Sequence, residues 1–169
     1  MTTDIVTKNS ILTEDAIRRK IRRMAFQVAE HNTDETEIVL IGIEGNGEVV
    51  AQNLLAELST ILTNPIATAT IRINKKEPLD AAIDGNIDVT NRVVILIDDV
   101  SNTGRTLLYA LKPLLHFLPK KIQTLVLVER SHKLFAVQPD YVGLSVSTTL
   151  QEHITVETAD GKLMGAWLH

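Results

Sequence analysis

The chain has 169 residues, and its 44% of hydrophobic residues is enough to form the core of a single domain. A formal net charge of −4 and an aromatic content of 4% argue against a general nucleic-acid-binding protein, since such proteins usually carry a basic excess and aromatic stacking surfaces. The absence of cysteine excludes disulfides and thiolate chemistry. No apolar run is long enough to span a membrane, and no apolar signal region follows Met1, so we expect a cytoplasmic protein.

The first half of the chain is predicted to alternate between helix and strand. A helix begins after an N-cap at Thr13 and stops at Asn32, because apolar residues recur there every three or four positions. The apolar run Ile38–Ile43 predicts a strand that is buried on both faces. A second helix covers Val49–Leu62, and a β-branched run at Ile66–Ile73 predicts the next strand.

The same alternation continues after a polar loop. Turn-forming residues fill Asn74–Asn91, and the apolar run Val93–Ile97 predicts another buried strand. A helix is predicted over Leu107–Phe117. Two further strands follow, one at Ile122–Val128 and a short one at Tyr141–Val142.

This order of elements predicts an α/β fold in which helices flank a doubly wound parallel sheet. The core is expected at about residues 14–143, within a single domain of residues 1–169. After Thr148 the alternation is lost. We expect the N-terminal residues and about residues 145–169 to pair as a small hood, or flap, over one edge.

The densest group of polar residues follows the strand Val93–Ile97. Asp98 and Asp99 stand at its carboxyl end, where open α/β sheets bind ligands, and alternation points them to different sides. Either carboxylate can hold ribose hydroxyls or order the water shell of Mg²⁺. A turn into a helix comes next, and its backbone amides and hydroxyls form a predicted 5-phosphate site. The members of that site are Val100, Ser101, Asn102, Thr103, Gly104, Arg105 and Thr106.

Two other phosphate motifs do not fit, and one structural alternative remains. Gly42 and Gly47 have the P-loop spacing, but Glu48–Val49 replaces its Lys-Ser/Thr pair. Gly45 and Gly47 begin a dinucleotide fingerprint that fails at Val50. The alternative is that the acidic pair and the threonine only end the strand and cap the following helix, which is a common structural arrangement. The convergence of acidic, hydroxylic and glycine residues favours the phosphate site.

The segment from Asp98 to Thr106 resembles the phosphoribosyl pyrophosphate signature of type I phosphoribosyltransferases. More of the chain, roughly residues 11 to 158, is similar to one branch of these enzymes, the bacterial pyrimidine-operon attenuation regulators. The segments that carry this similarity are Ile11–Leu12, Ala16–Arg19, Ile41–Ile43 with Gly47, Asp88–Thr90, Lys121–Gln123, Val126–Val128, Arg130 with His132, and Asp140–Gly143.

The resemblance implies magnesium-dependent formation of UMP and pyrophosphate from uracil and phosphoribosyl pyrophosphate, and a homodimer or higher oligomer. Members of this branch also bind messenger RNA when nucleotide is bound. The resemblance further implies a pyrophosphate loop at Glu44, Gly45, Asn46 and Gly47. It places Arg130, His132, Val142 and Leu144 near the base.

The chain departs from the family pattern at three places. Asn46, with the acidic Glu44 nearby, stands where the family usually has a basic residue. The loop at residues 73–87 is short, and Leu144 replaces a lysine near the base. We therefore expect slow transfer to uracil and tighter binding of a nucleoside monophosphate than of phosphoribosyl pyrophosphate. The alternative function is a catalytically weak, nucleotide-sensing, RNA-binding regulator of pyrimidine genes.

Five basic residues crowd the first predicted helix. They are either an RNA-contacting or oligomer-facing surface, or simply its solvated face. Because the net charge is acidic, we favour the absence of tight RNA binding. The five residues are Arg18, Arg19, Lys20, Arg22 and Arg23.

Overall fold

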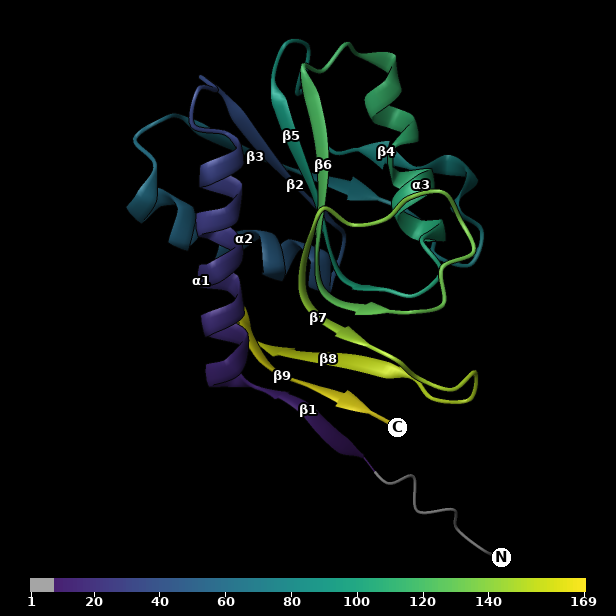
Figure 1. The fold of residues 1–169 in the computed structure, drawn as a ribbon. Helices are drawn as coiled ribbons and strands as arrows, with labels where there is room; N and C mark the ends of the chain where they lie inside the picture. Colours follow the sequence, from purple (N-terminus) through teal and green to yellow (C-terminus); the bar gives the residue numbers. More distant parts are fainter. Residues whose placement is uncertain (1–7) are drawn as a thin grey trace, which may run out of the picture.

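The computed structural model describes residues 8–169 and contains two β-sheets (Figure 1). The large sheet has the strand order β4-β3-β2-β5-β6-β7, and the small one has the order β1-β9-β8. In the large sheet only the edge strand β4 runs antiparallel to its neighbour. Its strands are β2 (Ile38–Ile43), β3 (Ile66–Arg72), β4 (Ala82–Ile83), β5 (Val93–Ser101), β6 (Lys121–Arg130) and β7 (Tyr141–Val146). The predicted α/β fold with a mainly parallel sheet is confirmed.

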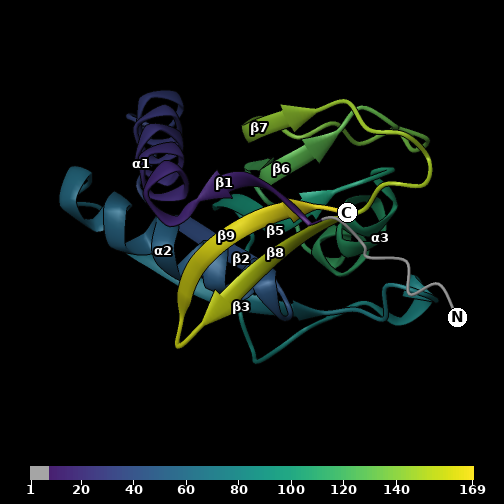
Figure 2. The ribbon, with the colours of Figure 1, turned by 90° about the horizontal axis from the view of Figure 1, so that it is seen from below.

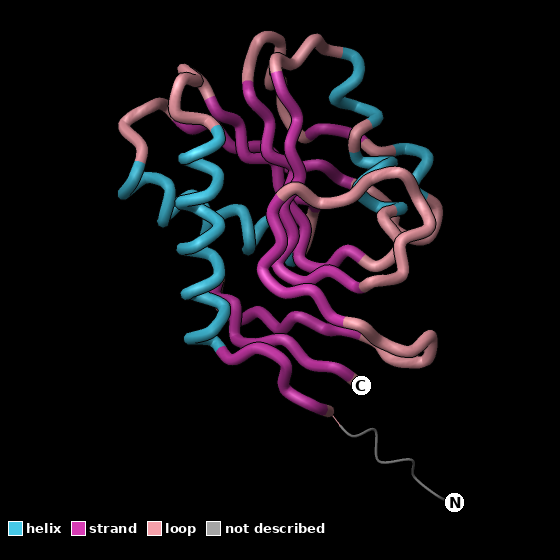
Figure 3. Tube along the Cα trace, in the orientation of Figure 1, coloured by secondary structure: helices cyan, strands magenta, loops and turns pink. Residues whose placement is uncertain are grey.

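Helices cover both faces of the large sheet (Figure 3). Helices α1 (Glu14–His31) and α2 (Asn46–Ile61) pack on one face. Helix α3 (Arg105–Ala110) and the 3₁₀ helix η2 (Lys112–His116) pack on the other. A second 3₁₀ helix, η1 (Pro78–Asp80), lies between β3 and β4. The central strand β2 is therefore buried at every residue, which explains its uninterrupted apolar sequence.

Helix α1 begins after Thr13 and stops at Asn32, as predicted. The Thr13 hydroxyl accepts the amide N–H of Ala16, and the Asn32 amide N–H is donated to the Ala29 carbonyl. The predicted helix 107–117 is instead two short segments, α3 and η2, because Pro113 has no N–H for an α-helical bond and its ring crowds the preceding turn. The predicted loop 74–91 likewise contains η1 and β4.

The small sheet joins the two ends of the described chain and is called the hood below. It comprises β1 (Asn9–Thr13), β8 (Ile154–Ala159) and β9 (Lys162–Leu168), so the N-terminal strand pairs with the C-terminal hairpin. Seen from below, β8 and β9 pass across the lower ends of β2 and β5 (Figure 2). Strand β8 contacts β5 and α2, which places the hood beside the carboxyl ends of the parallel strands. The first seven residues of the predicted hood lie outside the described part of the chain.

Strands β5, β6 and β7 are longer than the apolar runs that predicted them. Their polar carboxyl ends stay paired, as Ser101 does with Glu129 and Glu129 with Ser145. The candidate site residues at these ends therefore belong to the sheet itself. Between residues 8 and 169, no helix is long and apolar enough to cross a membrane.

Gly143 allows β6 and β7 to approach each other closely. A Cβ at this position would overlap the Leu127 carbonyl of the neighbouring strand. We expect Gly143→Ala to lower the free energy of unfolding by about 1–3 kcal/mol, because the obstacle is backbone and cannot move aside cheaply. Urea denaturation measures this change. Ser145→Ala on the same strand is exposed and is expected to change the value by less than about 0.5 kcal/mol, and equal midpoints for the two variants would contradict the packing argument.

Candidate functional site

Two adjacent carboxylates lie at the carboxyl end of β5. Asp98 is 1% exposed and Asp99 is 9% exposed. Lys75, from the segment after β3, approaches Asp98, and Asn46, from the start of α2, donates to Asp99. Each carboxylate also accepts a backbone N–H, from Asp99 to Asp98 at 2.9 Å and from Val100 to Asp99 at 2.8 Å. The strand, a loop and a helix therefore fix both groups.

Lys75 supplies the positive charge nearest to this pair. Its Nζ lies 3.3 Å from Asp98 Oδ1 and 4.0 Å from Asp99 Oδ1. Burial, together with the negative charge of Asp99, nevertheless raises the pKa of Asp98 to about 7, although Lys75 acts in the opposite direction. The place between the carboxylates is therefore one that attracts a cation.

This cation site fits Mg²⁺ only in part. No cluster of three or more potential metal-ligating side chains occurs in residues 8–169. Mg²⁺ prefers six oxygen ligands, so Asp98 and Asp99 would leave most positions to water and substrate oxygens. Such an arrangement suits a metal that arrives with a phosphorylated substrate.

The turn after β5 forms a polar cavity of about 270 Å³ beside Asp98. Gly104 adopts φ 86° at the start of α3, a left-handed conformation that glycine accepts without strain. A Cβ at Gly104 would lie 2.9 Å from the Val137 carbonyl, so this position has no room for a side chain. The cavity is lined by Lys75, Asp98, Val100, Ser101, Asn102, Thr103, Gly104, Arg105, Thr106 and Leu107. The structure therefore gathers the residues of the predicted phosphate segment around one hollow.

The connection between β6 and β7 supports this turn from behind. The Thr103 carbonyl accepts two backbone N–H groups, from Leu134 at 2.9 Å and Phe135 at 3.0 Å. On the other side, the Arg105 guanidinium reaches the Lys76 carbonyl at 3.4 Å. The sequence contained no signal for the first contact, because the carbonyl of any residue can accept such bonds.

The predicted pyrophosphate loop lies at the junction of β2 and α2. Glu44 and Gly45 are exposed, whereas Gly47 is buried so tightly that a Cβ would lie 2.9 Å from the Ile97 carbonyl. Glu48 accepts the Gly45 N–H at 2.9 Å and so caps the first turn of α2. Asn46 points away from solvent toward Asp99 and the hood. The loop therefore contributes a neutral amide to the site and no fixed cation.

Arg130 and His132 contact the segment that leads into the hood. Arg130 donates to the Thr148 hydroxyl at 2.7 Å, the Thr149 carbonyl at 2.9 Å and the Asn102 side chain at 3.2 Å. The His132 ring nitrogen Nε2 lies 2.6 Å from the Thr148 carbonyl. These bonds join the turn after β5 to the β7–β8 connection. They also use side-chain nitrogens of Arg130 and His132, two residues that were expected near a base.

The other two residues expected near the base lie on β7. The side chains of Val142 and Leu144 are partly buried and pack against two different clusters of the hydrophobic core. Arg23 of α1 donates to the carbonyls of Val142, at 3.0 Å, and of Gly143, at 2.9 Å. The Val142 carbonyl therefore already accepts a hydrogen bond within the chain.

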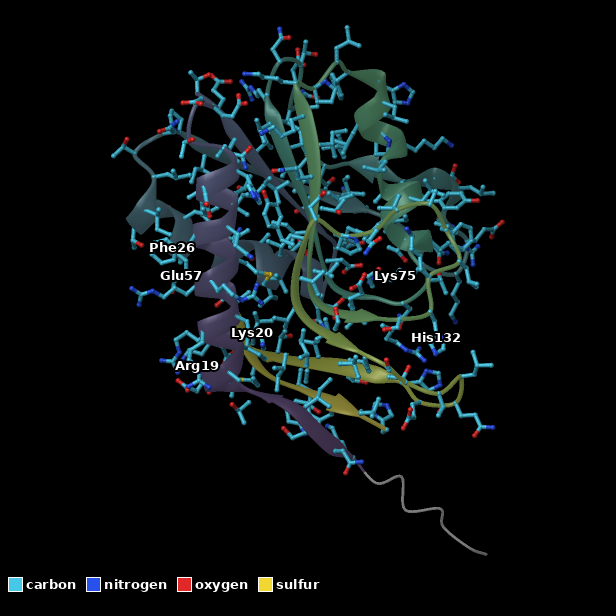
Figure 4. All side chains as sticks on the ribbon, viewed as in Figure 1. Arg19, Lys20, Phe26, Glu57, Lys75 and His132 are labelled. Carbon is cyan, nitrogen blue, oxygen red and sulfur yellow. The ribbon has the colours of Figure 1, made fainter. Side chains whose placement is uncertain are left out.

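The basic residues of α1 lie far from the carboxylates. Figure 4 shows Arg19, Lys20 and Phe26 along this helix, on the opposite side of the molecule from Lys75 and His132. Asp15 forms ion pairs with Arg19 at 2.7 Å and with Arg18 at 3.4 Å, and Arg23 is engaged by β7. Arg18, Arg19 and Arg23 therefore have partners within the chain, although Asp15 offsets only one positive charge and the carbonyls offset none.

The sequence matches the family model described as phosphoribosyl transferase domain over residues 8–160. It is 36% identical to the bifunctional protein PyrR of Halalkalibacterium halodurans over 162 residues, which cover 89% of this chain and 90% of that protein. It is 35% identical to the bifunctional protein PyrR of Bacillus subtilis, with the same coverage.

Solved phosphoribosyltransferases share the fold. The hypoxanthine phosphoribosyltransferase of Trypanosoma cruzi superposes with a TM-score of 0.73 at 19% identity, covering 82% of each chain. A hypoxanthine-guanine phosphoribosyltransferase of Bacillus anthracis gives a TM-score of 0.67 at 22% identity, again covering 82% of each chain.

The burial of Asp98 predicts a pH-dependent cost to stability. Its raised pKa means that the folded protein keeps a proton that the unfolded chain releases near pH 4, so stability falls as pH rises from about 4 to about 7. We expect Asp98→Asn to stabilise the protein at pH 8 by up to about 4 kcal/mol, or roughly 8–16 °C in Tm. The gain should shrink toward pH 4.

Thermal unfolding at pH 5 and pH 8 tests this expectation. Asp80→Asn, an exposed change in the connection between β3 and β5, is the control and should leave Tm unchanged at both pH values. A lower Tm for Asp98→Asn at pH 8 would show that the carboxylate stabilises the fold rather than straining it.

Proposed function

We propose that this chain, which belongs to the phosphoribosyl transferase domain family, transfers phosphoribose from phosphoribosyl pyrophosphate to uracil and releases UMP and pyrophosphate. The observation that carries the proposal is the position of the Asp98–Asp99 pair beside the turn Ser101–Thr106, which lines a small polar cavity suited to an anion. Carboxylates that accept ribose hydroxyls, next to backbone amides that hold a phosphate, match a ribose 5-phosphate.

In this proposal the turn anchors the 5-phosphate and the carboxylates hold the ribose. The bond between ribose C1′ and the pyrophosphate oxygen breaks, a bond from C1′ to the base nitrogen forms, and the proton of that nitrogen passes to water or to the released pyrophosphate. Positive charge develops on the sugar during the exchange, and the negative charges of Asp98 and Asp99 stabilise it. No protein nucleophile is required, because positioning and electrostatics supply the catalysis.

Magnesium belongs to the same proposal. When bound, Mg²⁺ neutralises charge on the departing pyrophosphate. Asp98 and Asp99 would hold it through water, because both carboxylates already accept hydrogen bonds from neighbouring groups.

Lys75 is the side chain placed to assist the leaving group. Glu44 and Asn46 give the pyrophosphate loop no positive charge, whereas Lys75 lines the polar cavity beside Asp98, called the phosphate cavity below. Its side chain is 49% exposed, so it is free to leave the carboxylates when substrate and metal arrive. We assign it the charge-stabilising role that a basic loop residue would otherwise take.

A nucleotide-sensing regulator that binds RNA is the second candidate. The neutral Asn46 favours it, because a site that holds ribose phosphate but stabilises pyrophosphate poorly suits sensing better than turnover. The acidic net charge of −4 argues against tight RNA binding. A filter-binding titration with a pyrimidine-leader hairpin and UMP tests this second candidate, which requires submicromolar affinity that falls steeply with salt.

Calorimetry and kinetics test the proposed activity. We expect UMP to bind more tightly than phosphoribosyl pyrophosphate with Mg²⁺, and uracil to turn over well below about 10 per second, a typical enzyme rate. Gly104→Ala should abolish UMP binding because its Cβ would displace the turn. Gly161→Ala, at another positive-φ glycine that lies in the hood hairpin, is the control for strain alone. Equal UMP affinity of Gly104→Ala and the parent would place the nucleotide elsewhere.

Replacing Lys75 tests the role of its charge. We expect Lys75→Ala to lower kcat by about 10²-fold, the usual effect of losing one preorganised stabiliser of transition-state charge, and to change UMP affinity much less. Lys76→Ala is the matched control, because that side chain is exposed and only its backbone carbonyl contacts Arg105. Equal kcat values for the two variants would remove Lys75 from the mechanism.

A further inference from the structure

Asn46 is held in one orientation at the centre of the site. It is the first residue of α2 and stands between Gly45, which has φ 92°, and the tightly packed Gly47. The hydrogen bond from the Gly45 N–H to the Glu48 carboxylate holds the backbone of this turn. The Asn46 side chain is half-buried and points between β5 and the hood strand β8.

The side-chain amide of Asn46 uses all of its polar groups to join three elements. Nδ2 donates to Asp99 Oδ2 at 3.0 Å and to the Val156 carbonyl at 2.9 Å. Oδ1 accepts the Thr158 hydroxyl at 3.3 Å. The two N–H bonds are those that a primary amide can donate, so α2, β5 and β8 meet at one satisfied group.

We propose that Asn46 is a positioning residue that couples the hood to Asp99, so that docking of β8 and orientation of this carboxylate depend on each other. The inference rests on the proposed function, because it gives Asp99 the task of holding ribose. Val156 is buried and contributes only its backbone carbonyl, whereas Thr158 contributes a side chain that can be replaced. Thr158 does not line the phosphate cavity and still reaches Asp99 through Asn46.

The chemistry of the junction accounts for a short neutral side chain at position 46. An arginine offers only donors and would leave the Thr158 hydroxyl without its acceptor. An aspartate has the same shape but donates to neither Asp99 nor Val156, and it would add a third negative charge. An amide alone supplies two donors and one acceptor without charge.

Thr158→Val tests the coupling at a distance, because it removes one hydroxyl and keeps the shape of the side chain. We expect this change to weaken UMP binding by about 3- to 10-fold, the effect of one hydrogen bond. Thr155→Val is the matched control: Thr155 lies on the same strand, and its hydroxyl faces His169 rather than Asn46. Equal UMP affinities of the two variants would overturn the proposal.

A double-mutant cycle separates coupling from a general loss of stability. If Asn46 transmits the effect, Thr158→Val should cause no further loss of UMP affinity in an Asn46→Ala background. A second loss of the same size would show that Thr158 acts independently, and this outcome too would overturn the coupling.

Hydrogen exchange of the ligand-free protein tests the junction without relying on the function. Asn46→Asp and Thr158→Val should both speed amide exchange in β8, whereas Thr155→Val should not. If the parent binds neither UMP nor phosphoribosyl pyrophosphate, the proposed function fails while this measurement still decides whether Asn46 holds the hood. Parent-like exchange in Asn46→Asp would show that it does not.

Discussion

The burial of two adjacent carboxylates at the end of β5 is the constraint on which the site depends. Neighbouring negative charges with little access to water are unstable unless other groups compensate them. Compensation comes from three separate parts of the chain: the Lys75 ammonium, the Asn46 amide and the local backbone N–H groups. The β2–α2 junction, the segment after β3 and the hood are thereby drawn to one edge of the sheet. A ligand that brings its own cation and hydroxyls can take over part of this compensation.

Local patterns predicted the parts of the fold that depend on local physics. The strands β2 and β5 are buried on both faces, so their apolar runs were unambiguous. Thr13 caps the start of α1 by accepting the N–H of Ala16 in the first turn. The turn at Gly104 was predictable as well, since glycine between a strand and a helix has few other uses. The break at Pro113 could have been read from the proline alone, and the prediction of one continuous helix was wrong there.

The rest of the site depends on contacts between residues that are distant in sequence. Asn46 was interpreted only as a missing basic residue, because nothing near it in the sequence indicates that Asp99 and Thr158 will be its partners. The hydrogen bonds from the β6–β7 connection to the Thr103 carbonyl are made by backbone groups, so the amino-acid sequence gives no sign of them. The roles assigned to the individual site residues remain predictions, whereas their assembly at one edge of the sheet is observed.

The contact of Arg23 with β7 has a consequence for self-association. Strand β7 ends the large sheet, and an edge strand offers unpaired backbone groups to any other strand that approaches. The Arg23 guanidinium occupies two neighbouring carbonyls there, and at the opposite edge β4 has only two residues. One edge is thus covered by a cation and the other is too short to template a new strand. Both edges of the large sheet therefore offer fewer free backbone groups to a strand of another molecule than a long, uncovered edge strand would.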